Sequence, residues 1–233
     1  MMNKKCMPHI ITVFGLLVLG FLGLACATTP EPVVVLGEGD AVIEDGVLVK
    51  LNKSFYGTIE IPNGVTKIGT DAFKGASLES IIIPNSVTEI ADGAFNNTLR
   101  LWYIKIPSSV TKIGKSFQGS GLKSITLPAT LKSLANGAFK DCHELTSLKI
   151  PEGSMTELQG REFWQCFKLK TIELPPSVTE IGYEAFYSCN SLETIRLAKG
   201  TVVSPDAYAR TGWGNDFTKE TTIAMAAGIF RFY

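Results

Sequence analysis

The clearest pattern in the chain is an alternation of apolar and other residues, L-x-x-I-x-[IL], which recurs seven times between residues 56 and 197. The copies are YGTIEI (56–61), LESIII (78–83), LWYIKI (101–106), LKSITL (122–127), LTSLKI (145–150), LKTIEL (169–174) and LETIRL (192–197). Alternating apolar positions are typical of β-strands with one buried face. Six copies end at a proline, and these prolines lie 22, 23, 21, 23 and 24 residues apart. We therefore predict one strand per repeat, ended by a residue that cannot donate to a ladder.

A second apolar pattern fills the segments between the strands. Each of the six returns holds two apolar residues three positions apart: Val65/Ile68, Val87/Ile90, Val110/Ile113, Leu131/Leu134, Met155/Leu158 and Val178/Ile181. Each return then holds one phenylalanine: Phe73, Phe95, Phe117, Phe139, Phe163 and Phe186. One repeat buries too few side chains to offset the entropy lost by its backbone, so neighbouring repeats must share a core. A fixed period of this length predicts a solenoid.

The shared pattern, L-x-x-I-x-[IL]-P-x-S-V-T-x-I-G-x-x-A-F-x-x-C, resembles the BspA-like leucine-rich repeat of host-associated bacteria and some protists. The resemblance covers about 140 of the 233 residues, in six successive units. It implies an α/β-type leucine-rich-repeat solenoid that is mostly β: a right-handed, curved stack of parallel strands, with a short extended segment opposite each strand. The departures are Ser116 and Glu162 in place of Ala before Phe, and Ala198-Lys199 in place of Pro after the last strand.

The first 25 residues have the features of an export signal. Lys4 and Lys5 precede an uncharged apolar stretch, residues 10–25, which is short for the ~20 residues that a membrane-spanning helix needs. The following Cys26 resembles the acylated cysteine of a bacterial lipoprotein, although Gly23 stands where that signal usually has Leu. Ala25-Cys26-Ala27 also fits an ordinary signal-peptidase site, so secretion after cleavage near Ala27 is the alternative.

The remaining segments are assigned from their composition and turn signals. Residues 26–39 are expected to be the lipidated cysteine and a tether, because they are rich in Pro, Thr and Gly. Residues 40–54 are expected to form a hairpin at Asp45-Gly46 that caps the N-terminal end of the repeats. The repeats are assigned to 55–197, and residues 198–233, where the period is lost, to a C-terminal cap.

Charge and residue content argue against several classes of function. The chain has 22 basic and 22 acidic residues, and removal of residues 1–25 leaves 20 against 22, so no basic excess favours nucleic-acid binding. His143 is the only histidine after the leader, and neither a nucleophile motif nor a phosphate-binding loop is present. We therefore expect no enzyme activity, no cofactor and no metal.

Three cysteines occupy one column of the repeat. Cys142, Cys166 and Cys189 each follow a repeat Phe by three residues, where earlier repeats have small residues: Ala76, Thr98 and Ser120. The column therefore favours a small side chain in a tight corner. A metal site with His143 and a disulfide between stacked neighbours are the alternatives, but spacings of 24 and 23 residues match no zinc pattern. The redox state of the three thiols stays open.

The outward strand positions suggest where a partner binds. The third position of each strand holds a hydroxyl: Thr58, Ser80, Tyr103, Ser124, Ser147, Thr171 and Thr194. Ile82 and Tyr103 break the polar character of neighbouring repeats, with Trp102 and Lys105 beside them. Apolar and aromatic residues exposed together are typical of interface hot spots. We expect Ile82, Trp102, Tyr103 and Lys105 to form a binding site, with local packing as the alternative.

These observations predict a non-enzymatic, exported protein that recognises another protein. The family resemblance implies adhesion to host or neighbouring-cell proteins, such as matrix or plasma glycoproteins. We expect a monomer held at the outer membrane or cell surface by the lipid on Cys26 alone. The alternative is a periplasmic lipoprotein that organises another protein of the envelope.

Overall fold

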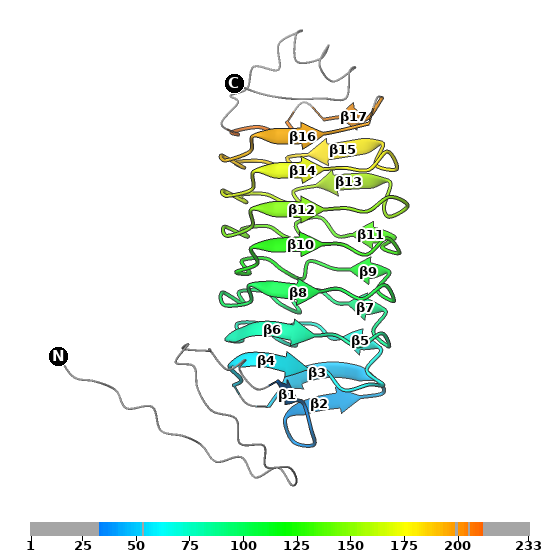
Figure 1. Ribbon diagram of the computed structural model, residues 1–233, viewed down its shortest axis with the longest axis vertical. Coiled ribbons are helices and arrows are strands. Elements are labelled where there is room, and N and C mark those ends of the chain that lie inside the picture. Colours follow the sequence, from blue (N-terminus) through cyan, green and yellow to red (C-terminus); the bar gives the residue numbers. More distant parts are fainter. Residues whose placement is uncertain (1–32, 53, 199, 205, 212–233) are drawn as a thin grey trace, which may run out of the picture. The chain divides into compact units, whose positions relative to one another are not determined.

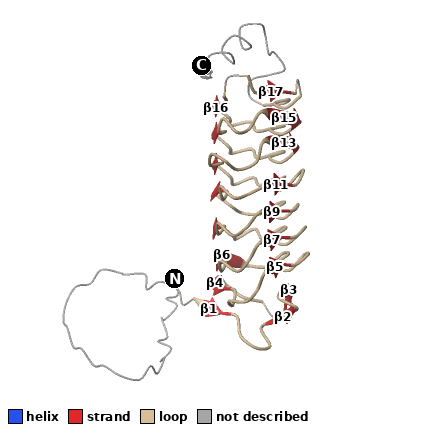
Figure 2. Cartoon of the chain, turned by 90° about the vertical axis from the view of Figure 1, so that its right-hand side faces the viewer, coloured by secondary structure: helices blue, strands red, loops and turns tan. Residues whose placement is uncertain are grey.

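The computed structural model describes residues 33–52, 54–198, 200–204 and 206–211. They form a stack of coils in which each coil contributes one strand to each of two opposite faces (Figures 1 and 2). The strand face contains β1 (Val34–Val35), β4 (Gly57–Glu60), β6 (Leu78–Ile82), β8 (Tyr103–Lys105), β10 (Ser124–Thr126), β12 (Ser147–Lys149), β14 (Thr171–Glu173) and β16 (Thr194–Arg196). The return face contains β3 (Val47–Leu51), β5 (Lys67–Ile68), β7 (Glu89–Ile90), β9 (Lys112–Ile113), β11 (Ser133–Leu134), β13 (Glu157–Gly160), β15 (Glu180–Tyr183) and β17 (Val202–Val203), with β2 (Ala41–Glu44) at its edge.

Pairing between coils is parallel, and the hairpin of β2 and β3 is the antiparallel exception. The strand face consists of two ladders, β1-β4-β6-β8 and β10-β12-β14-β16. The return face is also divided, into β11-β9-β7-β5-β3-β2 and β13-β15-β17. No helix occurs among the described residues, so none there is long and apolar enough to cross a membrane. The predicted mostly-β solenoid of parallel strands is confirmed, without helical returns.

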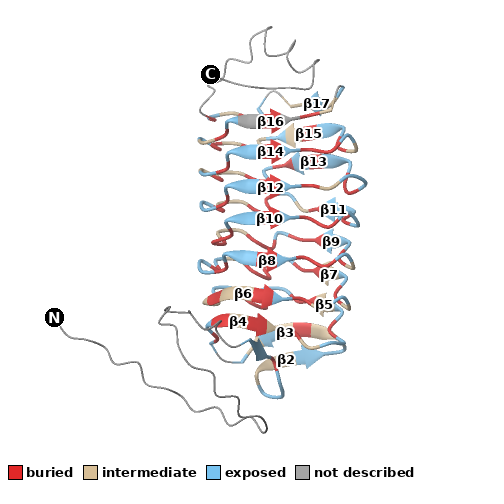
Figure 3. Ribbon diagram, viewed as in Figure 1, coloured by how far each residue is buried: buried red, intermediate tan, exposed pale blue. Residues whose placement is uncertain are grey.

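The core lies between the two faces and runs through every coil. The strand isoleucines and leucines predicted to point inward are buried, as are the apolar pairs of the returns (Figure 3). The six phenylalanines stack in one column, with ring centroids 5.0–5.5 Å apart and planes within 2–6° of parallel. Each ring covers the next, so no phenylalanine is buried by its own repeat alone. This contact explains why the repeats fold only as a stack.

The stack continues past residue 197, where the repeats were expected to end and the cap at 198–233 to begin. Strand β17 pairs with β15, placing Val203 beside Ile181. Tyr208 then stacks on Phe186 with centroids 5.4 Å apart, so Ala207-Tyr208 replaces Ala-Phe. The sequence pattern does not show this repeat because Tyr stands for Phe and Ala198, not proline, follows the strand that ends at Leu197. The aromatic residues assigned to the cap, Trp213, Phe217, Phe230, Phe232 and Tyr233, lie outside the described residues.

The N-terminal segment also differs from the predicted tether at 26–39. Val34 and Val35 form β1, which extends the strand face by pairing with Ile59 and Glu60 of β4. Residues 41–51 form an antiparallel hairpin whose strand β3 pairs with β5 of the return face. Its turn residues, Asp45 and Gly46, both have positive φ, at 49° and 77°. The proposed signal peptide and Cys26 lie outside the described residues.

Every coil reverses direction at a left-handed residue two positions after its aromatic ring. These residues are Gly75, Asn97, Gly119, Asp141, Gln165, Ser188 and Arg210, with φ between 55° and 69°. Gly, Asn and Asp tolerate this region of backbone conformation best, and they occupy this position in all of the first four coils. The later levels use residues for which the same conformation is less favourable.

Candidate functional site

The structure brings three of the four predicted binding residues together on neighbouring strands. In the β6–β8 ladder, Ile82 lies beside Lys105 and Ser80 beside Tyr103. Ile82 and Tyr103 are exposed by 42% and 56%, and Lys105 is also exposed. Apolar and aromatic surface therefore faces solvent at this place on the strand face, as the sequence pattern suggested.

Trp102 lies in the adjoining column, immediately before β8, and is 43% exposed. Its backbone N–H donates to the carbonyl of Glu79 at 3.1 Å, which fixes the start of β8 against the preceding coil. The ammonium of Lys123, from the next coil, lies 5.2 Å from the centre of its indole ring. This cation–π contact orients the ring and leaves part of it open to solvent.

A cavity of about 500 Å³ opens at the interruption of the strand-face ladder, between β8 and β10. Its polar lining includes Tyr103, Lys105, Ser108, Ser124 and Thr126. The coil that leads into β10 is the shortest, since its two prolines, Pro107 and Pro128, lie 21 positions apart. The coils on either side have a spacing of 23, so two residues are missing; each shortens the reach of a chain by about 3.3 Å, which is enough to displace a strand from its ladder partner.

Outward positions on β8, β10 and β12 and just before them form one exposed surface, which we call the strand-face patch. Its nine members are Trp102, Tyr103, Lys105, Lys123, Ser124, Thr126, Thr146, Ser147 and Lys149. Figure 3 shows β8, β10 and β12 with these outward residues exposed, whereas β4 and β6 are largely buried or intermediate.

The patch is positively charged and contains no carboxylate. The same outward positions of the two coils on each side do hold acids: Glu60 and Glu79 on one side, Glu173 and Glu193 on the other. They also hold Lys170, which forms an ion pair with Glu193 at 3.6 Å. Neither Lys105 nor Lys149 forms an ion pair with another described residue. Their positive charge is therefore available to a partner.

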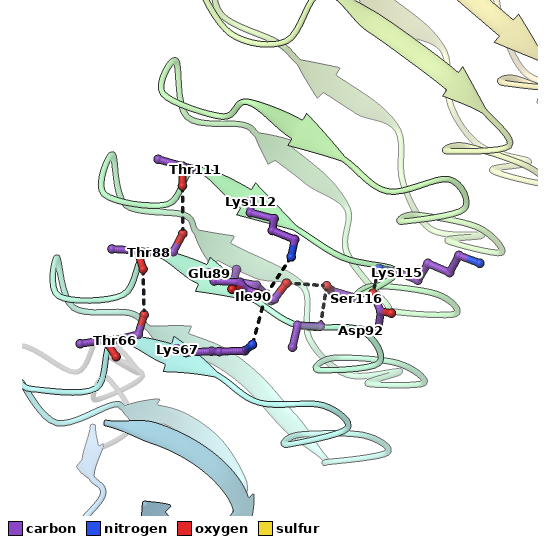
Figure 4. A network of polar contacts seen from close by, with 11 residues as sticks. Thr66, Lys67, Thr88, Glu89, Ile90, Asp92, Thr111, Lys112, Lys115 and Ser116 are labelled. Atoms are coloured by element: carbon purple, nitrogen blue, oxygen red, sulfur yellow. Dashed lines mark hydrogen bonds and ion pairs between the residues drawn. The ribbon is translucent and has the colours of Figure 1, made fainter. Parts of the chain in front are cut away.

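On the return face, one cluster of charges is paired within the protein. Glu89 on β7 lies between two lysines, 3.2 Å from Lys67 and 3.3 Å from Lys112 (Figure 4). Burial alone would raise the pKa of Glu89, but its hydrogen bonds to the two lysines outweigh burial and lower that pKa. Beside them, the hydroxyl of Thr88 donates to the carbonyl of Thr66 at 3.2 Å. These contacts hold coils together, and they leave little for a ligand to bind.

The cysteine column is internal. All three thiols are free and fully buried. Each donates to the carbonyl of a phenylalanine in the preceding coil: Cys142 to Phe117 at 3.0 Å, Cys166 to Phe139 at 3.2 Å and Cys189 to Phe163 at 3.2 Å. Burial raises the pKa values of Cys166 and Cys189 well above that of an ordinary thiol. The column therefore favours side chains that are small and also able to donate.

His143, the proposed metal partner of these thiols, is exposed and stacks on Phe167 with ring centroids 4.7 Å apart. Among the described residues, no group of three or more His, Cys, Asp or Glu side chains is placed to hold a metal ion. The same residues bring no catalytic constellation together around the cavity, whose lining is hydroxyl, lysine and apolar.

Sequence reasoning missed Lys123, Ser124, Thr126 and Lys149 as parts of the site. Individually they match the hydroxyl and charge pattern of every repeat, so their composition gives no signal. The short 21-residue coil was the available signal, because it marks where the ladder is interrupted.

Comparison with known proteins supports the architecture. The family model described as "BspA type Leucine rich repeat region" matches six copies over residues 51–116 and 114–215. A leucine-rich repeat protein from Bacteroides ovatus is 28% identical, with a TM-score of 0.64 and coverage of 77% of this chain and 49% of the other. A leucine rich cell surface protein from Faecalibacterium prausnitzii is 26% identical, with a TM-score of 0.52 and coverage of 73% and 48%.

The pneumococcal vaccine antigen PcpA shares the fold, with 20% identity, a TM-score of 0.56 and coverage of 71% of this chain and 49% of the antigen. The chain thus spans about half the length of these three proteins. No curated protein matches it.

Proposed function

Because the chain belongs to the BspA-type leucine-rich-repeat family, we propose that it is a non-enzymatic recognition protein that binds a protein partner through the strand-face patch. Repeat proteins of this class generally serve as binding scaffolds. The observation that carries the proposal is the coincidence of exposed Trp102 and Tyr103, unpaired Lys105 and the cavity at the ladder interruption. The return face has no comparable surface of exposed aromatic residues beside unpaired lysines within the described coils.

The patch is suited to binding because its backbone is already ordered. Strands β8, β10 and β12 are anchored by their central residues, Ile104, Ile125 and Leu148, whose side chains are buried in the core. Binding on such a surface does not need to order a loop, so less conformational entropy is lost. Aromatic residues add large contact areas with few rotatable bonds, which is why they dominate interface energetics.

The finer proposal is adhesion at the cell surface, to host or neighbouring-cell proteins such as matrix or plasma glycoproteins. Three points support it: the export signal predicted from the sequence with Cys26 at its end, the family match, and the similarity to a protein described as a leucine rich cell surface protein. In this proposal the lipid on Cys26 holds the protein in the envelope, and β1 begins eight residues after it. The recognition surface then lies on the coils that contain β8, β10 and β12.

The binding experiment compares the mature chain, residues 27–233, with the double variant Trp102→Ala/Tyr103→Ala. Immobilised matrix and plasma glycoproteins are the targets, and binding is measured by biolayer interferometry. Tyr183→Ala is the matched control, because this tyrosine is 48% exposed but lies on the return face. We expect the double variant to lose at least tenfold in affinity, and the control to bind as the unmodified chain does. Equal binding by all three proteins, or by none, would contradict the proposal.

Location is tested separately, on intact cells that express the full chain. Added protease should cleave the protein if it faces outward, and a Cys26→Ser variant should move from the membrane to the soluble fraction. Protection from protease until the envelope is opened would instead favour the alternative function, a periplasmic organising lipoprotein.

A further inference from the structure

We propose that the strand-face patch recognises an extended acidic segment of its protein partner. This inference rests on the proposed recognition function and specifies the chemistry of the partner. It draws on the arrangement of the nine outward residues, on the charges around them and on the cavity at the ladder interruption.

The charge distribution selects an anionic partner. The patch holds Lys105, Lys123 and Lys149 in three successive coils and no acid of its own. The nearby Glu144, whose pKa is lowered mainly by Lys168 and also by Lys123, offsets part of the charge of Lys123, whereas Lys105 and Lys149 have no such partner among the described residues. The mature chain as a whole is slightly acidic, with 20 basic against 22 acidic residues after removal of 1–25. The positive charge of the patch is therefore a local feature, since the chain as a whole has no excess of basic residues. It attracts negatively charged groups within the Debye length, which is about 8 Å at physiological salt.

The carboxylates on either side confine that attraction to three coils. Glu79 lies in the coil before the patch, bound to Arg100 at 2.6 Å, and Glu173 lies in the coil after it. Adjacent parallel strands are about 4.8 Å apart, so Lys105 and Lys149 are separated by roughly 10 Å along the stack. A segment of three or four extended residues has this length. The patch therefore fits a short acidic run within a protein.

The residues between the lysines suit a peptide. Ser124 and Thr126 line the cavity between β8 and β10, and their hydroxyls can donate to carboxylates or to backbone carbonyls. Tyr103 lies at the same cavity and provides apolar contact together with a second polar group. This mixture of hydroxyl, aromatic and ammonium groups matches a chain with alternating side chains and a polar backbone.

A sulfated polysaccharide is the rival ligand, and the structure favours it less. Surfaces that bind such polymers usually present dense clusters of Lys and Arg, often as basic runs of 5–8 residues. The patch holds three lysines and no arginine, and the acids beside it limit the length of polymer that it can accommodate.

The test uses a fluorescein-labelled decapeptide of alternating Glu and Gly, with the matched Gln-Gly decapeptide as the neutral probe. Anisotropy is measured with the mature chain and with the triple variant Lys105→Gln/Lys123→Gln/Lys149→Gln. The charge-matched control is Lys74→Gln/Lys115→Gln/Lys132→Gln, which removes three exposed lysines outside the patch. A size-matched heparin oligosaccharide serves as the sulfated competitor, and thermal unfolding confirms that every variant is folded.

We expect the Glu peptide to bind the mature chain, and the patch variant to bind it about tenfold more weakly, because exposed ion pairs contribute modestly and three are lost. The control variant should bind the peptide unchanged, and higher salt should weaken binding. Equal affinity for the Gln peptide, equal loss in the control variant, or tighter binding of heparin through the same lysines would each overturn the inference. Failure of this inference can be distinguished from failure of the proposed function. If Trp102→Ala/Tyr103→Ala loses glycoprotein binding while the triple lysine variant binds glycoprotein fully, the recognition function stands. The inference that the partner presents an acidic segment is then wrong.

Discussion

Glu162 offers a quantitative test of how this solenoid accommodates an irregular coil. It occupies the position before Phe that holds alanine in most repeats, and its side chain is fully buried. Both carboxylate oxygens accept hydrogen bonds from the backbone N–H of Gly160, at 2.9 and 3.0 Å. Gly160 has a φ of 141°, and a Cβ there would lie 2.5 Å from the carbonyl oxygen of Tyr183. The carboxylate thus completes a bend that only glycine permits.

The expected pH dependence follows from the direction of the pKa shift. Burial raises the pKa of Glu162 above its value in the unfolded chain, although the hydrogen bond from Gly160 opposes the shift. The neutral form is therefore favoured by folding. Its contribution is complete below the unfolded pKa, about 4.3, and is lost as the pH rises through the higher folded value, at about 1.4 kcal/mol for each unit by which the two differ. Glu162→Gln keeps an accepting oxygen and removes the ionisation.

The assay is urea unfolding at pH 4, 5.5 and 7 for the unmodified chain, Glu162→Gln and Glu162→Ala. The difference between the Gln variant and the unmodified chain isolates Glu162 from other carboxylates, such as Glu89, whose lowered pKa acts in the opposite direction. We expect the Gln variant to gain relative stability as the pH rises. Glu162→Ala should lose about 1–3 kcal/mol, because the Gly160 N–H is left without an acceptor. Parallel pH curves for the Gln variant and the unmodified chain would refute this reasoning.

Three further predictions concern the columns of the stack. Gln165→Gly should raise the free energy of unfolding by about 0.5 kcal/mol, since Gln165 adopts a φ of 59° that glycine reaches without strain; a lower urea midpoint would contradict this. Phe117→Ala should cost about 3–5 kcal/mol, because this ring stacks on both Phe95 and Phe139; thermal unfolding measures the loss, and a cost below about 1 kcal/mol would show that the stack contributes little. The three buried thiols should resist iodoacetamide at pH 8 in the native protein and react after unfolding in urea, because burial raises the pKa values of Cys166 and Cys189; rapid native labelling, followed by mass spectrometry, would contradict their burial.

The core was predictable because one physical requirement repeats in every coil. A strand isoleucine or leucine, a return pair and a phenylalanine must be apolar at each level, and the period makes that requirement visible. Where a residue type changes while the requirement stays, as at Tyr208, the pattern no longer matches and the repeat is missed. The same holds for Val34 and Val35, which pair with β4 but lie in a segment rich in Pro and Thr. The physical character required at each repeat position is thus a more reliable guide to the repeats than the exact residue type found there.

The left-handed turns show a different limit. Gly75, Asn97, Gly119 and Asp141 form a recognisable column of residues that tolerate positive φ, but Gln165 and Ser188 continue it without any such preference. Here the stack imposes the backbone conformation, since each turn hydrogen-bonds to the one beside it: the N–H of Asp141 donates to the carbonyl of Trp164, and that of Gln165 to Tyr187. Local sequence preference helps at the early levels and is overruled at the later ones.

The interruptions of the two sheets connect the sequence to the candidate site. The coil leading into β10 is the shortest, with its prolines 21 positions apart, and the strand-face ladder is interrupted immediately before β10. The longest spacing, 24 residues, begins at Pro151 and includes β13, and the return-face ladder is interrupted immediately before that strand. The short coil is two residues shorter than the 23-residue coils on either side of it, and the long coil is one residue longer than the coil before it; in each case one of the two ladders is interrupted. The core is continuous across both places because Phe117, Phe139 and Phe163 stay stacked. Irregular coil length therefore opens the surface without opening the interior, and one of the two openings lies among the exposed aromatic residues and lysines from which recognition is proposed.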